Sequence, residues 1–221
     1  MVNQKLLCFF VAPIETARIT PELFVVKALT VNFFIFRSGT ATICFDTGFH
    51  LKTIRRELQK IDIDPRSITH VFLTHTDIDH AGGLRLFSNA TIYFSADEEQ
   101  MITHQRARLL GCIFNPRIKT SYQLLKDNET VAAGSLTIKA ISTPGHTPGS
   151  MSYLLNDSLL FVGDTLRLID KMVFPIGRII NMDTALQIAS IRKLARLENV
   201  KMAFTAHSGY TTDFEASIAG W

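Results

Sequence analysis

Residues 74–80 concentrate side chains that bind metal ions. The segment reads Thr-His-Thr-Asp-Ile-Asp-His and so carries two imidazoles and two carboxylates. Imidazole nitrogens and carboxylate oxygens are ligands that zinc, iron and manganese take from proteins. Four such groups within six residues therefore predict part of a metal site.

An apolar segment leads into this cluster. Residues 68–73 are rich in β-branched and aromatic side chains, which predicts a strand that places His75 at the end of a sheet. If the chain stays extended beyond that point, His75, Asp77 and Asp79 lie on one side. His80 would then point elsewhere. Such an arrangement suits two neighbouring ions better than one.

Three later apolar segments also end at a histidine or an aspartate. An alternating run stops at the Pro/Gly-rich turn that holds His146, and two further runs lead into Asp164 and His207. The alternative is that these residues are ordinary hydrogen-bonded core or surface groups. Scattered structural histidines would seldom follow strand ends so regularly, so we expect the three residues to join residues 75–80 in one site.

In these residues the chain resembles the metallo-β-lactamase-fold hydrolases. The family signature is an Asp, then His-x-His-x-Asp-His, then His, Asp and His further along, and nearly the whole chain takes part. The matching positions are Asp46, residues 75–80, His146, Asp164 and His207. The resemblance implies an α+β fold, a four-layer αβ/βα sandwich of two mixed β-sheets with outer helices.

The resemblance also implies a centre of two divalent ions. One ion would be held by His75, Asp77 and His146, the other by Asp79, His80 and His207, with Asp164 bridging both and Asp46 supporting the ligands from behind.

The chain departs from the family pattern at Asp77, where the family usually has histidine. A carboxylate can still bind zinc, but it favours iron or manganese more than an imidazole does, so we expect zinc, iron or manganese. Three carboxylates and a bridging hydroxide would neutralise two divalent ions, which predicts either weaker attraction of anionic substrates or tolerance of a trivalent ion. The alternative is that Asp77 turns away and only the second site fills.

The expected activity is hydrolysis of a small ester, thioester, lactone or phosphoester by a metal-bridging hydroxide, since metal-bound water ionises near neutral pH. By its place in the site, Asp79 would orient this hydroxide and carry a proton to the leaving group. Two alternatives stay open. One is a di-iron redox protein related to flavodiiron cores, and the other is a metal-dependent binding or sensing protein.

Two basic segments, residues 104–119 and 167–178, could overhang the site and hold a substrate carboxylate or phosphate. Arg117 and Arg167 are the candidates from them, and Tyr210 could donate to a developing oxyanion. The competing interpretation gives the arginines solvated surfaces and gives Tyr210 a packing role.

The whole chain limits the remaining possibilities. Its 221 residues lack a Pro/Gly/Ser-rich linker, so we expect a single domain over residues 1–221. The net charge of +3 from 23 basic and 20 acidic residues is too nearly balanced to indicate nucleic acid or an anionic membrane, and we expect a small-molecule substrate. The absence of a long apolar stretch argues against a membrane partner, and three cysteines without paired spacing suit a reducing cytoplasm.

Hydrophobic periodicity predicts the remaining elements. Strands are expected near residues 5–11, 24–28, 31–37, 41–45, 68–73, 91–94, 136–141, 150–155, 159–162 and 202–205, and helices over residues 51–60, 81–87 and 184–197.

Overall fold

The computed structural model describes residues 12–108, 111 and 113–221. Within them, β-strands form a seven-stranded sheet in the order β1-β2-β3-β4-β5-β6-β7, a six-stranded sheet in the order β15-β14-β11-β10-β9-β8, and the hairpin β12-β13. Both large sheets are mixed, because β4 to β7 run parallel in the first and β11 pairs parallel with β14 in the second.

The strands of the first sheet are β1 (Ala17–Arg18), β2 (Leu23–Ala28), β3 (Val31–Arg37), β4 (Thr42–Phe45), β5 (His70–Phe72), β6 (Thr91–Ser95) and β7 (Tyr122–Leu125). Those of the second are β8 (Thr130–Ala133), β9 (Leu136–Ser142), β10 (Met151–Leu155), β11 (Leu159–Gly163), β14 (Met202–Thr205) and β15 (Gly209–Thr211), and the hairpin is β12 (Arg167–Ile169) with β13 (Met172–Phe174). The helices are α1 (Leu51–Lys60), α2 (Ile78–Ala81), α3 (Glu99–Ile102), α4 (Thr184–Leu194) and α5 (Phe214–Ile218), with short 3-10 turns at Pro65–Ser67, Leu84–Leu86 and Ala96–Glu98.

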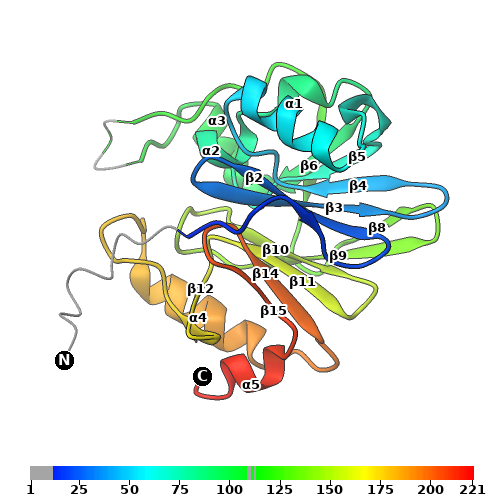
Figure 1. Ribbon diagram of the computed structural model, residues 1–221. Coiled ribbons are helices and arrows are strands. Elements are labelled where there is room, and N and C mark those ends of the chain that lie inside the picture. The colour runs from blue at the N-terminus through cyan, green and yellow to red at the C-terminus, as the bar shows by residue number, and fades with distance from the viewer. Residues whose placement is uncertain (1–11, 109–110, 112) are drawn as a thin grey trace.

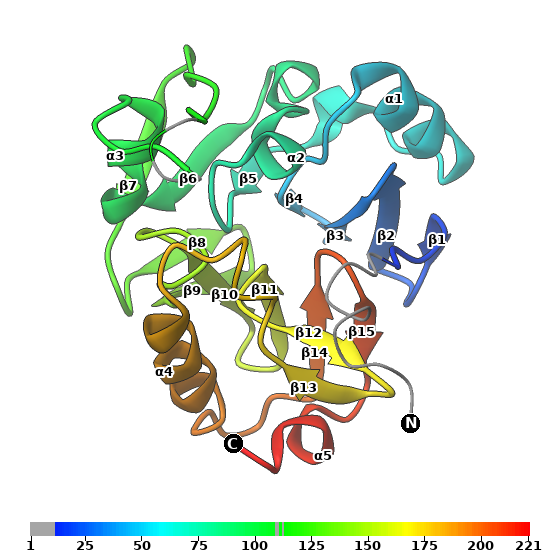
Figure 2. The ribbon, with the colours of Figure 1, turned by 90° about the vertical axis from the view of Figure 1, so that its left-hand side faces the viewer.

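The two large sheets pack face to face, and helices cover their outer faces. Helices α1 to α3 lie on the side of the first sheet, and α4 and α5 lie on the side of the second (Figures 1 and 2). Neighbouring residues of one strand alternate between layers. Val26 packs toward α1 and Val25 into the space between the sheets, while Leu160 packs toward α4 and Phe161 between the sheets. The predicted αβ/βα sandwich is thereby confirmed.

Most strands predicted from hydrophobic runs are present within a residue or two of their expected bounds. The predicted strand over residues 5–11 lies outside the described residues. Sequence patterns missed β1, β7, β8, β12, β13 and β15, which are short strands of two to four residues. Cys44 is buried in β4 as a free thiol, and burial raises its pKa.

The helix predicted over residues 81–87 was wrong as one element. Helix α2 ends at Ala81, and a separate 3-10 turn begins at Leu84. Gly83 lies between them, where the chain passes close to the backbone of Thr47. A Cβ atom at Gly83 would lie 2.3 Å from the Thr47 carbonyl oxygen. The glycine thus lets α2 sit against the loop that follows β4.

Aromatic rings fill the centre of the space between the sheets. The ring of Phe161 stacks on Phe45 with centroids 3.7 Å apart and an interplanar angle of 10°, and it also stacks on Phe204 at 4.6 Å. Phe45 and Phe204 belong to different sheets, so these contacts fix the sheets to each other. Aromatic contacts of this kind add to the free energy gained from burial alone.

We expect Phe161→Ala to lower the free energy of unfolding by about 3–5 kcal/mol, because it removes a fully buried ring and leaves a cavity. Phe174→Ala is the matched control, since Phe174 is 42% exposed on β13. Urea denaturation of both variants measures the difference. Equal losses would contradict the central place given to Phe161.

Candidate metal centre

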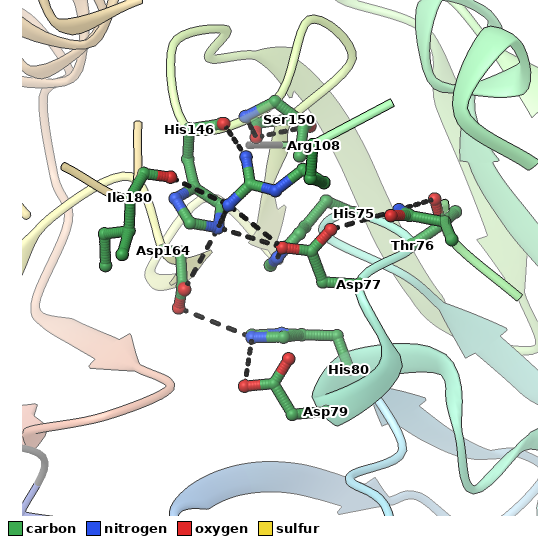
Figure 3. A network of polar contacts seen from close by, with 12 residues as sticks. His75, Thr76, Asp77, Asp79, His80, Arg108, His146, Ser150, Asp164 and Ile180 are labelled. Carbon is green, nitrogen blue, oxygen red and sulfur yellow. Dashed lines mark hydrogen bonds and ion pairs between the residues drawn. The ribbon is translucent and has the colours of Figure 1, made fainter. Parts of the chain in front are cut away.

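The predicted metal-binding side chains meet at one edge of the two sheets. His75 lies three residues after β5, and Asp164 directly follows β11. His146 lies in the loop between β9 and β10, and His207 lies in the turn between β14 and β15. Four connections from two sheets therefore bring their polar residues to a common point, and Figure 3 shows His75, His146 and Asp164 there.

Among the described residues, three groups of side chains have ligand atoms close enough to hold a metal ion. They are His75, Asp77 and His146; Asp79, His80 and His207; and His75, His80 and Asp164. The first group is called the first cluster below, and the second group together with Asp164 is called the second cluster. Asp164 lies between the two, with Oδ2 3.4 Å from His146 Nε2 and Oδ1 3.3 Å from His207 Nε2.

The imidazoles share one orientation, in which Nδ1 has a protein partner and Nε2 faces the centre. His80 Nδ1 lies 2.9 Å from Asp46 Oδ2, and His207 Nδ1 lies 2.8 Å from the Thr30 carbonyl oxygen. His75 Nδ1 contacts the Thr74 hydroxyl at 3.1 Å, and His146 Nδ1 contacts Asn181 Oδ1 at 3.4 Å. Such partners fix the tautomer and direct the Nε2 lone pair toward an ion.

Several inward-facing atoms have no hydrogen-bond partner among the residues that the structure describes. They are His75 Nε2, His80 Nε2 and Asp164 Oδ1, and all three are buried. Buried polar atoms are normally paired, because burial without a partner costs free energy. A divalent cation is a group that could satisfy two imidazole nitrogens and a carboxylate oxygen together, so these residues fit a metal ion.

The packed charges shift the pKa of several groups. Burial alone would lower the pKa of His80, but the carboxylates of Asp46, Asp164 and Asp79 raise it to about 10. Burial opposes the shift of His207 in the same way, and Asp164 raises the pKa of that histidine to about 9. Burial would raise the pKa of Asp164, but His207 and His80 hold it well below its usual range. An ion would replace the protons on these imidazoles, because only deprotonated side chains act as ligands.

The local geometry of the first segment differs from its prediction. The chain does not stay extended, since α2 begins at Ile78 with Asp77 at its N-cap position. Asp79 therefore joins His80 and His207 rather than His75 and Asp77. His80, which an extended chain would have turned away, points into the centre.

Asp46 connects the centre to the strands behind it. Its carboxylate accepts hydrogen bonds from the Thr74 backbone N–H at 2.7 Å and from the Thr74 hydroxyl, and it contacts His80 Nδ1. Asp46 has a φ of 60°, a left-handed conformation that aspartate adopts more readily than most residues. Gly163 lies against the same threonine, since a Cβ atom there would be 2.3 Å from Thr74 Oγ1.

Glu98 was not singled out from the sequence, yet it joins two of the loops. It is fully buried and accepts hydrogen bonds from the Thr76 N–H and hydroxyl, the Thr147 hydroxyl and the Gly149 N–H. Burial raises the pKa of this carboxyl group. Glu98 lies in an ordinary acidic run, Asp-Glu-Glu, so no local signal marks it.

Part of the basic segment 104–119 does overhang the centre. Arg108 is 8% exposed, and its Nη2 lies 3.2 Å from Asp77 Oδ2 and 3.1 Å from His146 Nε2. Asn115 is also buried and donates from Nδ2 to Asp77 Oδ1 at 3.0 Å. Arg108 and Asn115 of this segment thus contact the carboxylate of Asp77, a group of the protein itself rather than of a substrate.

The other candidate residues come from three different parts of the fold. Tyr210 stacks on Phe204 with ring centroids 5.7 Å apart and packs against the core between the sheets, which is the alternative role considered for it. Arg117 is exposed, and Arg167 begins β12.

The three histidines outside the clusters have ordinary partners. His50 contacts the Thr53 hydroxyl, His70 stacks on Phe72, and His104 contacts the Asn115 carbonyl oxygen.

Comparisons with known proteins find relatives of the same fold. The family model of the metallo-beta-lactamase superfamily matches residues 26–207. Among solved structures, the Rm3 metallo-beta-lactamase superposes with a TM-score of 0.73 and 16% identity, covering 99% of this chain and 94% of that chain. A metallo-beta-lactamase family protein from Thermus thermophilus gives a TM-score of 0.71 with 17% identity over 92% of this chain and 79% of that one. These likenesses concern the fold.

Curated relatives are similar over part of their length. A probable polyketide biosynthesis zinc-dependent hydrolase from Bacillus velezensis is 33% identical over 59% of this chain and 52% of its own length. A probable metallo-hydrolase from Methanocaldococcus jannaschii is 31% identical over 71% of this chain and 64% of its own. An N-acyl homoserine lactonase from a Bacillus species is 30% identical over 44% of this chain and 37% of its own.

We expect Asp46→Asn to weaken metal binding roughly 10–100-fold, because the amide cannot accept from His80 and Thr74 as the carboxylate does. A competition titration against a chromophoric chelator measures the dissociation constant. Asp157→Asn, at an exposed turn residue, is the control and should bind as the unmodified protein does. An unchanged dissociation constant for Asp46→Asn would remove Asp46 from the site.

Proposed function

The chain belongs to the metallo-beta-lactamase superfamily, and we propose that it is a metal-dependent hydrolase of small esters, thioesters, lactones or phosphoesters. The inward orientation of the Nε2 atoms, two of which are buried without a hydrogen-bond partner among the described residues, carries this proposal. The relatives named as a zinc-dependent hydrolase and a lactonase support the reaction class.

We place the reaction at the second cluster. A divalent ion held there would supply hydroxide at neutral pH by lowering the pKa of water. Asp79 is the most exposed carboxylate of the cluster, at 29%, and its Oδ2 lies 3.6 Å from His207 Nε2. We assign Asp79 the transfer of a proton from the nucleophile to the leaving group. The two-ion form predicted from the sequence needs an ion at the first cluster as well, where Arg108 lies against Asp77 and His146.

An apolar cleft adjoins the two clusters. Its volume is about 380 Å³, and it is lined by Asp77, Ile78, Asp79, Arg108, Ile113, Phe114, Asn115, Pro116 and Ile180. Ile78 is 62% exposed, and Phe114 and Ile113 are each about half exposed. Exposed apolar side chains beside a polar centre indicate a binding surface for an apolar group. We therefore propose substrates that carry an apolar acyl chain next to the bond that is cleaved.

The described part of the chain contains no helix that could serve as a membrane span.

A hydrolysis panel of esters, thioesters, lactones and phosphodiesters, run with metal-loaded and chelator-treated protein, tests the function. We expect turnover that chelation abolishes and added metal restores. Iron with oxygen-dependent oxidation and no hydrolysis would favour a redox protein instead, and bound metal without any turnover would favour a binding or sensing protein.

On the substrate that turns over fastest, Asp79→Asn should lower kcat roughly 10²–10⁴-fold, because the amide cannot carry the proton. Metal content measured on the same sample separates this effect from loss of the ion. Asp157→Asn should keep the original rate. An Asp79→Asn enzyme with full metal content and an unchanged kcat would contradict the assigned role.

Phe114→Ala should raise KM roughly tenfold for long acyl chains and leave KM for acetyl substrates nearly unchanged, because only a long chain reaches the cleft. Initial rates across an acyl-length series measure this. Phe174→Ala, which removes an exposed phenylalanine outside the cleft, is the control. An equal effect on short and long chains would exclude the cleft as the acyl site.

A further inference from the structure

The two clusters differ in how their ligand atoms are occupied. Among the described residues, His80 Nε2 and Asp164 Oδ1 of the second cluster are buried without a hydrogen-bond partner, and so is His75 Nε2 of the first cluster. The other two residues of the first cluster differ, because His146 Nε2 and Asp77 Oδ2 both lie within 3.2 Å of the Arg108 guanidinium. Figure 3 shows Arg108 between these two side chains. A permanent organic cation therefore contacts two of the three residues that would hold an ion.

The position of Arg108 does not depend on the cluster alone. Its Nη1 donates to the His146 carbonyl oxygen, and its Nη2 donates to the Ile180 carbonyl oxygen at 2.8 Å. The backbones of Arg108 and Ile113 pair in an isolated β-bridge, which fixes the base of the side chain. Arg108 is thus held by backbone groups from three segments, and these backbone groups are not metal ligands.

The contact with His146 uses the electron pair that an ion would need. A neutral imidazole has one lone pair, on the ring nitrogen that carries no proton. Nδ1 faces Asn181 Oδ1 and carries the proton, which leaves the lone pair on Nε2. Because Nε2 accepts from Arg108 at 3.1 Å, the same lone pair cannot also bind a metal ion.

Asp77 is satisfied in the same way. Its Oδ2 faces Arg108 and its Oδ1 accepts from Asn115, so one loop supplies a partner to each oxygen. The guanidinium stays charged at every pH that a folded protein tolerates, and it balances the charge of this carboxylate. A divalent ion at the same place would face repulsion from the fixed cation.

We propose that Arg108 takes the place of the first metal ion, so that the folded protein holds a single divalent ion, at the second cluster. This inference rests on the proposed function, because it takes the second cluster as a metal site. It identifies Arg108 as a positioning residue that determines metal stoichiometry and gives Asp77 the role of a counterion.

The test is metal content of the full chain. Chelator-stripped protein is equilibrated with excess Zn²⁺, desalted and analysed for zinc and protein. We expect about one zinc ion per chain for the unmodified protein and about two for Arg108→Met, which removes the charge and frees His146 Nε2. Arg106→Met, an exposed arginine of the same segment, is the matched control and should keep one ion.

Two more variants locate the single ion. His207→Ala should lose it, whereas His146→Ala should retain it, because only His207 belongs to the second cluster. If circular dichroism shows that Arg108→Met fails to fold, Arg108→Gln replaces it, since the amide can still donate to a backbone carbonyl but carries no charge.

The outcomes are distinct. Two ions in the unmodified protein, or one ion in folded Arg108→Met and Arg108→Gln as well, would overturn the role given to Arg108. No ion in the unmodified protein would instead overturn the proposed metal-dependent function. One ion that rises to two only in the Arg108 variants supports the inference.

Discussion

The fixed orientation of four imidazole rings is the constraint on which the centre depends. Each ring has its Nδ1 atom engaged by a group behind it, so Nε2 has one direction in which to point. The engaging groups are Thr74, Asp46, Asn181 and the Thr30 carbonyl, and they come from loops of both halves of the sandwich. The geometry of the site is therefore a property of the packed sheets, because no single loop could hold these rings.

The strand ends and the ligand types could be predicted because their signals are local. Apolar runs that lead into Asp164 and His207 are strands by composition alone, and β11 and β14 lie where those runs predicted. The division of ligands into two clusters followed from family resemblance, and the described ligand atoms group in that way. The side chains between His75 and His80 do not alternate as in an extended chain, because α2 begins at Ile78 and changes their directions.

The residues that could not be predicted act through contacts distant in sequence. Arg108 and Glu98 are charged, and a local pattern assigns such residues to the surface. Their burial is compensated by partners as far as 72 residues away, as in the bond from Arg108 to Ile180. Pairing of this kind depends on which loops meet once the sheets have packed. Short edge strands such as β7, whose residues are mostly exposed or half-buried, carry too little hydrophobic contrast for detection.

The hydrogen bond between His207 and Thr30 links the turn between β2 and β3 in one sheet to the loop after β14 in the other. His80 and Asp79 approach the same point from the first sheet's side, so an ion at the second cluster would be bound by residues of both halves and would link them. Binding to the folded state alone raises the free energy of unfolding. Loss of an ion bound there would consequently lower the free energy of unfolding as well as remove the proposed catalytic centre.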